Sequence, residues 1–109
     1  MPEDFRQKRA EDVVRSLAAD FLARNSNKTS LITVTGIDMS PDGKHVTILV
    51  SVLPESALTG ALDFANRNRE GFRDLLKKRA RLRTIPYIKF EFDKGEENRR
   101  KITDLLAKE

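Results

Sequence analysis

The chain has 109 residues, of which 39% are hydrophobic and 35% are charged, and its 21 Lys and Arg residues against 17 Asp and Glu residues give a formal net charge of +4. This length favours a single domain over residues 1–109. The hydrophobic content excludes a disordered chain. The apolar runs are too short to cross a bilayer, which excludes a membrane protein. The first ten residues are charged throughout and do not resemble a signal peptide, so we expect a cytoplasmic protein that contacts no membrane.

Groups that could carry catalysis or bind a metal are scarce in the sequence. Cysteine is absent, which excludes disulfides, thiolate catalysis and sulfur-ligated zinc. His45 is the only histidine, and it directly precedes an alternating run of β-branched residues. We therefore expect His45 to face solvent or to have a structural role rather than to act in a catalytic triad. The sequence predicts no catalytic residue, no metal site and no cofactor.

The first half of the chain predicts one helix and a pair of strands. Apolar residues recur at spacings of three and four from about Asp4 to Arg24, which is typical of a helix with one buried stripe. The stretches 31–39 and 45–52 are rich in β-branched residues and predict strands. Ser40-Pro41-Asp42-Gly43 lies between them with Pro and Gly at favoured turn positions, so we expect an antiparallel hairpin.

The second half predicts two helices joined by a kink, then a strand and a short helix. We expect Ser56 to cap the first of these helices, and the stretch 66–71 interrupts them with poor helix formers. Alternation over 88–93 predicts the last strand, and residues Glu96 to Ala107 predict the closing helix. The resulting fold class is α+β, in the order α-β-β-α-kink-α-β plus a short C-terminal helix, with a three-stranded sheet and helices on one face.

Positive charge is concentrated between Arg67 and Lys89. This stretch has nine basic residues, six of them arginine, against two acidic residues, so its net charge is +7. Four of the cations are spaced four residues apart, and on an ideal helix they form a stripe of mutually repelling charges. Arginine suits bidentate contacts with phosphate, so we predict RNA or DNA as the ligand, with a merely solvated helix face as the alternative. The stripe consists of Arg69, Arg73, Lys77 and Arg81.

For two side chains of this stretch, Tyr87 and Arg79, the sequence allows two alternative interpretations each. Tyr87 is expected on the strand face opposite to Phe90, which fills the core, so Tyr87 is a candidate for stacking on a base, with a structural role as the alternative. The helical wheel places Arg79 amid the apolar stripe. Either the helix ends before Arg79, or its guanidinium extends past the edge of the core to a partner.

Three stretches of the sequence resemble those of a known family. They are Arg6-Gln7-Lys8-Arg9, the stretch 33–42, and the stretch 81–93 with its Arg-Leu-Arg-x-x-Pro motif. Together with the order of the expected elements, they make the chain similar to bacterial ribosome-binding factor A, a family with a type II KH-like domain. The Ala-x-Gly that usually marks the interhelical kink in this family falls on Asn68-Arg69-Glu70, with Gly71 one place later. The kink is therefore expected at Asn68, Glu70 and Gly71.

The resemblance implies a non-enzymatic assembly factor that binds the immature 30S ribosomal subunit and assists late maturation of 16S rRNA, including processing at the 5′ end. Its partners would be the 30S subunit and 16S rRNA or its precursor, and the free protein would be a monomer. The chain lacks the Gly-x-x-Gly loop with which KH domains bind single strands. We therefore expect it to recognise the shape of folded RNA.

The residues expected to contact RNA phosphate are basic residues of the kink, of the helix after it and of the first helix. They are Arg69, Arg73, Lys77, Lys78, Arg81 and Arg83, with Arg6, Lys8 and Arg9 as possible helpers. Two other functions stay open. One is a protein-interaction module whose basic helix binds an acidic protein partner, and the other is a small hydrolase that would depend on His45 or on carboxylates.

Overall fold

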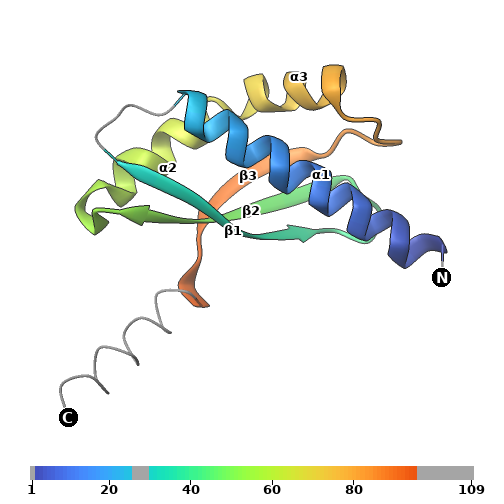
Figure 1. Cartoon of the computed structure of the whole chain (residues 1–109), viewed down its shortest axis with the longest axis horizontal. Helices are drawn as coiled ribbons and strands as arrows, with labels where there is room; N and C mark the ends of the chain where they lie inside the picture. The colour runs from blue at the N-terminus through green and yellow to red at the C-terminus, as the bar shows by residue number, and fades with distance from the viewer. Residues whose placement is uncertain (1, 26–29, 96–109) are drawn as a thin grey trace, which may run out of the picture.

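The computed structural model describes residues 2–25 and 30–95 and divides them into four helical segments and three strands. In chain order they are α1 (Pro2–Asn25), β1 (Leu31–Met39), β2 (His45–Leu53), the 3-10 helix η1 (Glu55–Ala57), α2 (Leu58–Arg67), α3 (Arg69–Arg79) and β3 (Tyr87–Phe92) (Figure 1). This order confirms the predicted α-β-β-α-kink-α-β fold. The predicted helix from Glu96 to Ala107 lies outside the described residues.

The strands form one sheet in the order β1-β2-β3, with β1 and β2 antiparallel and β2 and β3 parallel. The predicted hairpin is confirmed. The N–H of Gly43 donates to the C=O of Ser40 at 2.9 Å, and Gly43 has a φ of 73°, a left-handed angle that favours glycine. Because β3 runs parallel to β2, the chain crosses back over the sheet through α2 and α3, and β3 begins beside the hairpin turn.

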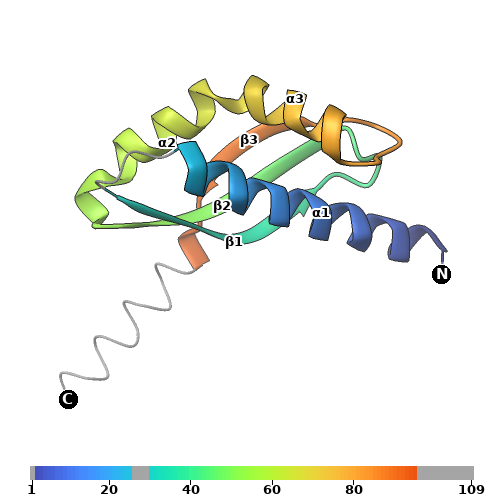
Figure 2. The ribbon, with the colours of Figure 1, turned by 45° about the horizontal axis from the view of Figure 1, so that its top comes forward.

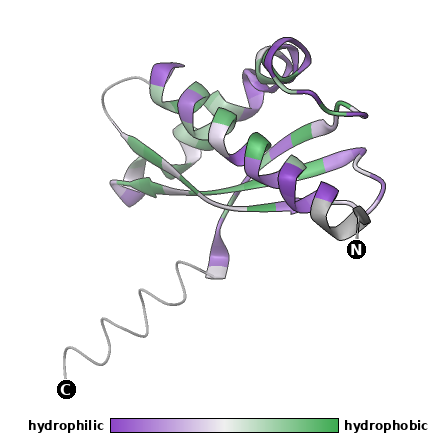
Figure 3. Cartoon of the chain, turned by 45° about the vertical axis from the view of Figure 1, so that its right-hand side comes forward, coloured by the Kyte–Doolittle hydropathy of each residue, from purple (hydrophilic) through white to green (hydrophobic). Residues whose placement is uncertain are grey.

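Helices α1, α2 and α3 lie on one face of the sheet (Figure 2). None of these three helices lies on the opposite face, which we call the open face. β2 buries every second residue from Val46 to Val52 against the helices, and β3 buries Ile88 and Phe90 in the same way. His45 of β2 and Tyr87 of β3 lie on the open face and are exposed. Hydrophobic and hydrophilic residues accordingly succeed each other along the strands (Figure 3).

The core joins the helices to the sheet through aromatic and aliphatic side chains. The apolar stripe of α1 is buried, with Val14 at 0% exposure. Phe72 of α3 is also fully buried, and its ring centroid lies 5.3 Å from that of Phe21 and 6.2 Å from that of Phe90. Phe72 thus links α1 to β3, and the predicted core position of Phe90 is confirmed.

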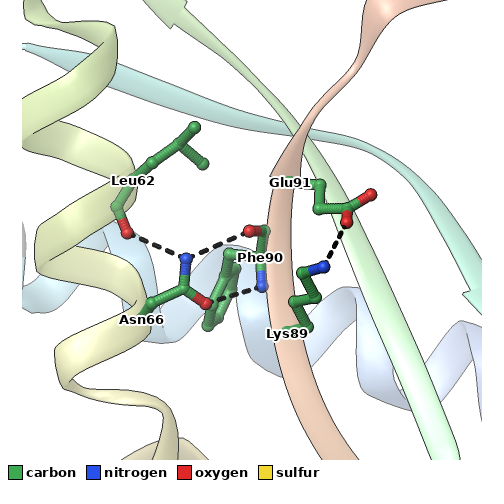
Figure 4. Close-up of polar contacts among 5 residues, drawn as sticks. All are labelled: Leu62, Asn66, Lys89, Phe90 and Glu91. Carbon is green, nitrogen blue, oxygen red and sulfur yellow. Dashed lines mark hydrogen bonds and ion pairs between the residues drawn. The ribbon is translucent and has the colours of Figure 1, made fainter.

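Asn66 of α2 binds the outer edge of β3 (Figure 4). Its Nδ2 donates to the C=O of Phe90 at 3.1 Å and to the C=O of Leu62 at 3.2 Å, and its Oδ1 accepts the N–H of Phe90 at 2.9 Å. The amide therefore satisfies both backbone groups that Phe90 turns away from β2, as a neighbouring strand would. This contact fixes α2 against the sheet.

The break between α2 and α3 is one residue long. Asn68 has φ −100° and ψ 8°, and its N–H lies 3.2 Å from the C=O groups of both Phe64 and Ala65. Its side chain donates to the C=O of Phe64 at 2.8 Å, which satisfies a carbonyl at the end of α2. Glu70 and Gly71 lie in the first turn of α3, and neither adopts a left-handed angle.

The start of α2 differs from the sequence-based expectation. Ser56 lies inside η1, and the residue at the N-cap of α2 is Ala57, which makes no side-chain cap hydrogen bond. The predicted capping role of Ser56 is therefore wrong. The 3-10 turn supplies a backbone hydrogen bond instead, from the N–H of Ala57 to the C=O of Pro54 at 2.9 Å.

Candidate nucleic-acid interface

Segments that are far apart in the sequence meet at the end of the sheet that carries the β1–β2 turn, which we call the hairpin end. The Nε2 of Gln7 donates to the C=O of Met39 at 3.4 Å, which places the first turns of α1 there. The N–H of Tyr87 donates to the C=O of Lys44 at 2.8 Å, which places the start of β3 beside the turn. The segment 80–86, which follows α3, reaches the same end, at the right of Figure 1.

Exposed basic side chains from three of these segments surround the hairpin end. α1 contributes two, the turn contributes one, and segment 80–86 contributes two. Among residues 2–25 and 30–95, none of these five takes part in an ion pair. Positive charge at this end is therefore available to an anionic partner. We call them the hairpin-end cations: Arg6, Lys8, Lys44, Arg81 and Arg83. Arg9 is exposed in the same turn of α1.

Asp42 is the acidic residue of the turn, and its carboxylate is engaged within the turn itself. Its Oδ1 accepts hydrogen bonds from the Oγ of Ser40 at 2.6 Å and from the N–H of Lys44 at 3.0 Å. The bond from Ser40 and then the bond from Lys44 lower the pKa of Asp42 below its usual value of 3.8. The ionised carboxylate stabilises the turn and offsets part of the local positive charge.

Arg73 is attached to the protein rather than directed at solvent. Its Nε donates to the C=O of Pro86 at 3.1 Å, and its Nη2 donates to the C=O of Ile85 at 3.2 Å. The guanidinium carbon also lies 4.7 Å from the centroid of the Tyr87 ring, within cation–π distance. These contacts engage two of the five N–H donors of Arg73 and attach segment 80–86 to α3.

The predicted helical stripe ends earlier than expected. Ala80 is extended, with φ −99° and ψ 138°, and is buried, so α3 ends at Arg79. Arg81 therefore lies off the helix, and its predicted place in the stripe with Arg69, Arg73 and Lys77 is wrong. Arg79 is the last residue of α3 and is exposed, so the helix does not end before it and its side chain is not buried in the core.

The basic residues of α3 divide between two flanks of the helix. Arg73 faces the carbonyls that precede β3, whereas Lys78 lines a groove of about 290 Å³ between α3 and the last turns of α1. Asp20 and Asp74 also line this groove, so its charge is mixed. The predicted phosphate ligands on α3 therefore do not all face the same side of the helix.

Lys77 and Arg69, the other two predicted cations of α3, are exposed, and only Lys77 lies in an ion pair of the described residues. The Nζ of Lys77 lies 3.7 Å from the Oδ1 of Asp74, an exposed pair of the kind that contributes about 0–1 kcal/mol. Arg69 opens α3, far along the helix from segment 80–86, and lies in no ion pair of the described chain. Lys78 and Arg79 are likewise outside the ion pairs of residues 2–25 and 30–95.

Tyr87 and His45 form an exposed aromatic pair at the hairpin end. The two residues are register partners in β3 and β2, and their ring centroids lie 5.7 Å apart with an angle of 32° between the planes. Lys44, directly before His45, was not among the predicted site residues. The sequence could have indicated Lys44 only if the parallel pairing of β3, which brings Tyr87 to the turn, had been known.

Two classes of site do not occur in the part of the chain that the structure describes. No group of three or more His, Asp or Glu side chains in residues 2–25 and 30–95 could hold a metal ion. Within the same ranges, no helix combines the length and the apolar character needed to cross a membrane.

Comparison with known proteins gives consistent matches. The family model for ribosome-binding factor A matches residues 6–106. A ribosome-binding factor A from Natranaerobius thermophilus is 33% identical over 105 residues, which cover 94% of this chain and 80% of the relative.

Solved structures match in the same way. The crystal structure of ribosome-binding factor A from Thermus thermophilus superposes with a TM-score of 0.66 at 24% identity, over 74% of this chain and 89% of the other. A homology model of the Thermus thermophilus factor, fitted into the cryo-EM map of a 30S complex, gives 0.67 at 23% identity, over 78% and 92%. At these identities the structures establish a shared fold. Since the family model spans nearly the whole chain, this chain belongs to the ribosome-binding factor A family.

Proposed function

We propose that this chain is a non-enzymatic assembly factor that binds the immature 30S ribosomal subunit through 16S rRNA or its precursor. Its family supports this, as does the fold it shares with the Thermus thermophilus factor fitted into a 30S complex. The observation that carries the proposal is the convergence of the hairpin-end cations from three separate segments, outside the ion pairs of the described residues.

Phosphate is the partner that suits this surface. Arg81 and Arg83 can each present a planar fork of donors to phosphate oxygens, and Lys44 supplies a point charge at the same end of the sheet. Binding an RNA backbone releases its condensed counterions and removes the repulsion among the cations. A folded RNA presents several phosphates at fixed spacing, which fits a set of cations placed by α1, the turn and segment 80–86.

The role we propose follows from binding rather than from chemistry. A factor that holds precursor rRNA in one shape assists late maturation of 16S rRNA, and with it processing at the 5′ end by a separate nuclease. It works in the cytoplasm, where bacterial ribosomes are assembled, and it is a monomer when free.

Co-sedimentation with immature 30S subunits tests the proposal. We expect Arg81→Gln with Arg83→Gln to reduce binding by at least tenfold, because two phosphate contacts are lost. The matched control is Arg24→Gln with Arg67→Gln, which removes the same charge from exposed ion pairs with Asp20 and Asp63. This control should bind as the unchanged protein does.

Two outcomes would contradict the proposal. Equal loss of binding in both double variants would mean that total charge matters and the hairpin end does not. Binding that survives digestion of the RNA would indicate an acidic protein partner instead.

A further inference from the structure

We propose that Tyr87 and His45 form a stacking platform for one unpaired nucleobase of the bound RNA. The proposal rests on the proposed function, because it names the part of the RNA that the hairpin end recognises beyond phosphate. Tyr87 is 59% exposed, whereas Phe72 and Phe90 are buried in the core. A large ring that folding leaves in solvent contributes little to stability and remains available to a partner.

The Tyr87 ring has neighbours that hold it in one place, although more than half of its surface stays exposed. Its backbone N–H is bonded to Lys44, its register partner His45 lies beside it, and the guanidinium of Arg73 lies against its ring. Arg73 is itself fixed by its hydrogen bonds to the carbonyls of segment 80–86. A ring already fixed in its bound orientation loses little conformational entropy when a base stacks on it.

The charges around the platform favour a nucleotide over an apolar peptide. Lys44 precedes His45 in the chain, and Arg83 lies in the segment that leads into Tyr87. Lys89 follows on the same face of β3, where its Nζ is 2.7 Å from the Oε1 of Glu91. A base on the aromatic pair would therefore carry its own phosphates toward cations, which is the pattern of stacking platforms that bind single-stranded segments.

The single tyrosine gives this proposal a direct readout. The chain contains one Tyr and no Trp, so its ultraviolet emission reports on Tyr87 alone. We would titrate the full-length protein with a short oligoadenylate and with an abasic oligonucleotide of the same length. Oligoadenylate should quench the emission and bind about tenfold more tightly than the abasic strand, because only the former offers a base to stack.

Variants separate stacking from charge and from folding. Because these variants lack the tyrosine, their binding is read from the fluorescence anisotropy of labelled strands. Tyr87→Leu should bind both strands as weakly as the unchanged protein binds the abasic strand, and Tyr87→Phe should keep the preference for bases. Leu53→Ala is the matched control, since Leu53 is 51% exposed on the same open face at the opposite end of β2, and it should change nothing. Thermal denaturation of each variant confirms that the fold is intact.

The outcomes distinguish this inference from the proposed function. If the unchanged protein binds both strands equally without quenching, or if Tyr87→Leu keeps the preference for bases, the platform does not exist. A third outcome would also overturn the inference. If Tyr87→Leu loses binding to the subunit while the unchanged protein shows no preference for the strand with bases, the ring contacts a protein. The Arg81→Gln, Arg83→Gln variant reports on the proposed function separately, since it should weaken both strands alike.

Discussion

Arg73 is a basic residue whose side chain joins two segments of the protein. Its guanidinium donates to two carbonyls of segment 80–86 and lies over the Tyr87 ring, so it holds this segment against α3. Sequence spacing placed Arg73 in a stripe of phosphate ligands, because spacing along a helix does not reveal which acceptors another segment brings to it.

We expect Arg73→Ala to lower the free energy of unfolding by about 1–2 kcal/mol, because two carbonyls lose charged donors. Arg73→Lys should recover only part of this loss, since an ammonium group cannot bond both carbonyls and cover the ring at once. Urea denaturation measures the change. Lys77→Ala, which removes an exposed cation from the same flank, should leave the midpoint nearly unchanged.

Gly71 and Gly43 illustrate opposite requirements for glycine. Gly71 is helical, and a Cβ there would lie 3.9 Å from the Cζ of Phe21, an ordinary contact. Gly71→Ala should therefore raise the free energy of unfolding by about 0.5–1 kcal/mol through helix propensity. Gly43→Ala should lower it by about 1 kcal/mol, because its left-handed φ of 73° disfavours a side chain. A thermal shift of the same sign in both variants would contradict this assignment.

At the scale of elements, the contact between α2 and the outer edge of β3 positions the two helices that connect β2 to β3. The Asn66 amide makes the two backbone hydrogen bonds with Phe90 that a neighbouring strand would make. These bonds satisfy part of the exposed backbone at this edge of the sheet.

We expect Asn66→Ala to lower the free energy of unfolding by about 1–3 kcal/mol, because the N–H and C=O of Phe90 lose their partners in a half-buried place. Hydrogen exchange at the Phe90 amide should become faster than at other amides of β3. The matched control is Asn25→Ala, because the Asn25 amide makes an exposed bond to Phe21 within its own helix, at 2.8 Å. Equal effects of the two substitutions would argue against the special role of Asn66.

The order of elements was predictable because periodicity is a local property. The alternation from Val46 to Val52 and the Ser40 to Gly43 turn determine a hairpin wherever it packs. The end of α3 was not predictable in the same way. Ala80 is a good helix former, yet it is extended because the core takes up its methyl group and the chain must turn toward β3. Tertiary packing thus overrides propensity at that residue.

At the scale of the whole molecule, the direction of β3 brings the hairpin-end cations to one end of the sheet. Parallel pairing with β2 brings segment 80–86 and Tyr87 to the turn, where Lys44 and the first turns of α1 already lie. An antiparallel β3 would send Arg81 and Arg83 to the opposite end of the sheet. The basic composition of 67–89 was visible in the sequence, but this strand direction, and therefore the grouping of its charges, required the structure.

The salt dependence of binding to immature 30S subunits tests the phosphate-binding role of the hairpin end most directly. Each phosphate contact contributes about 0.7–0.9 to the slope of log K against log salt. The Arg81→Gln, Arg83→Gln variant should therefore show a slope that is smaller by about 1.4–1.8 than that of the unchanged protein, whereas the Arg24→Gln, Arg67→Gln control should keep the full slope. An identical slope for all three proteins would contradict the account, because it would mean that no phosphate is bound at this end of the sheet.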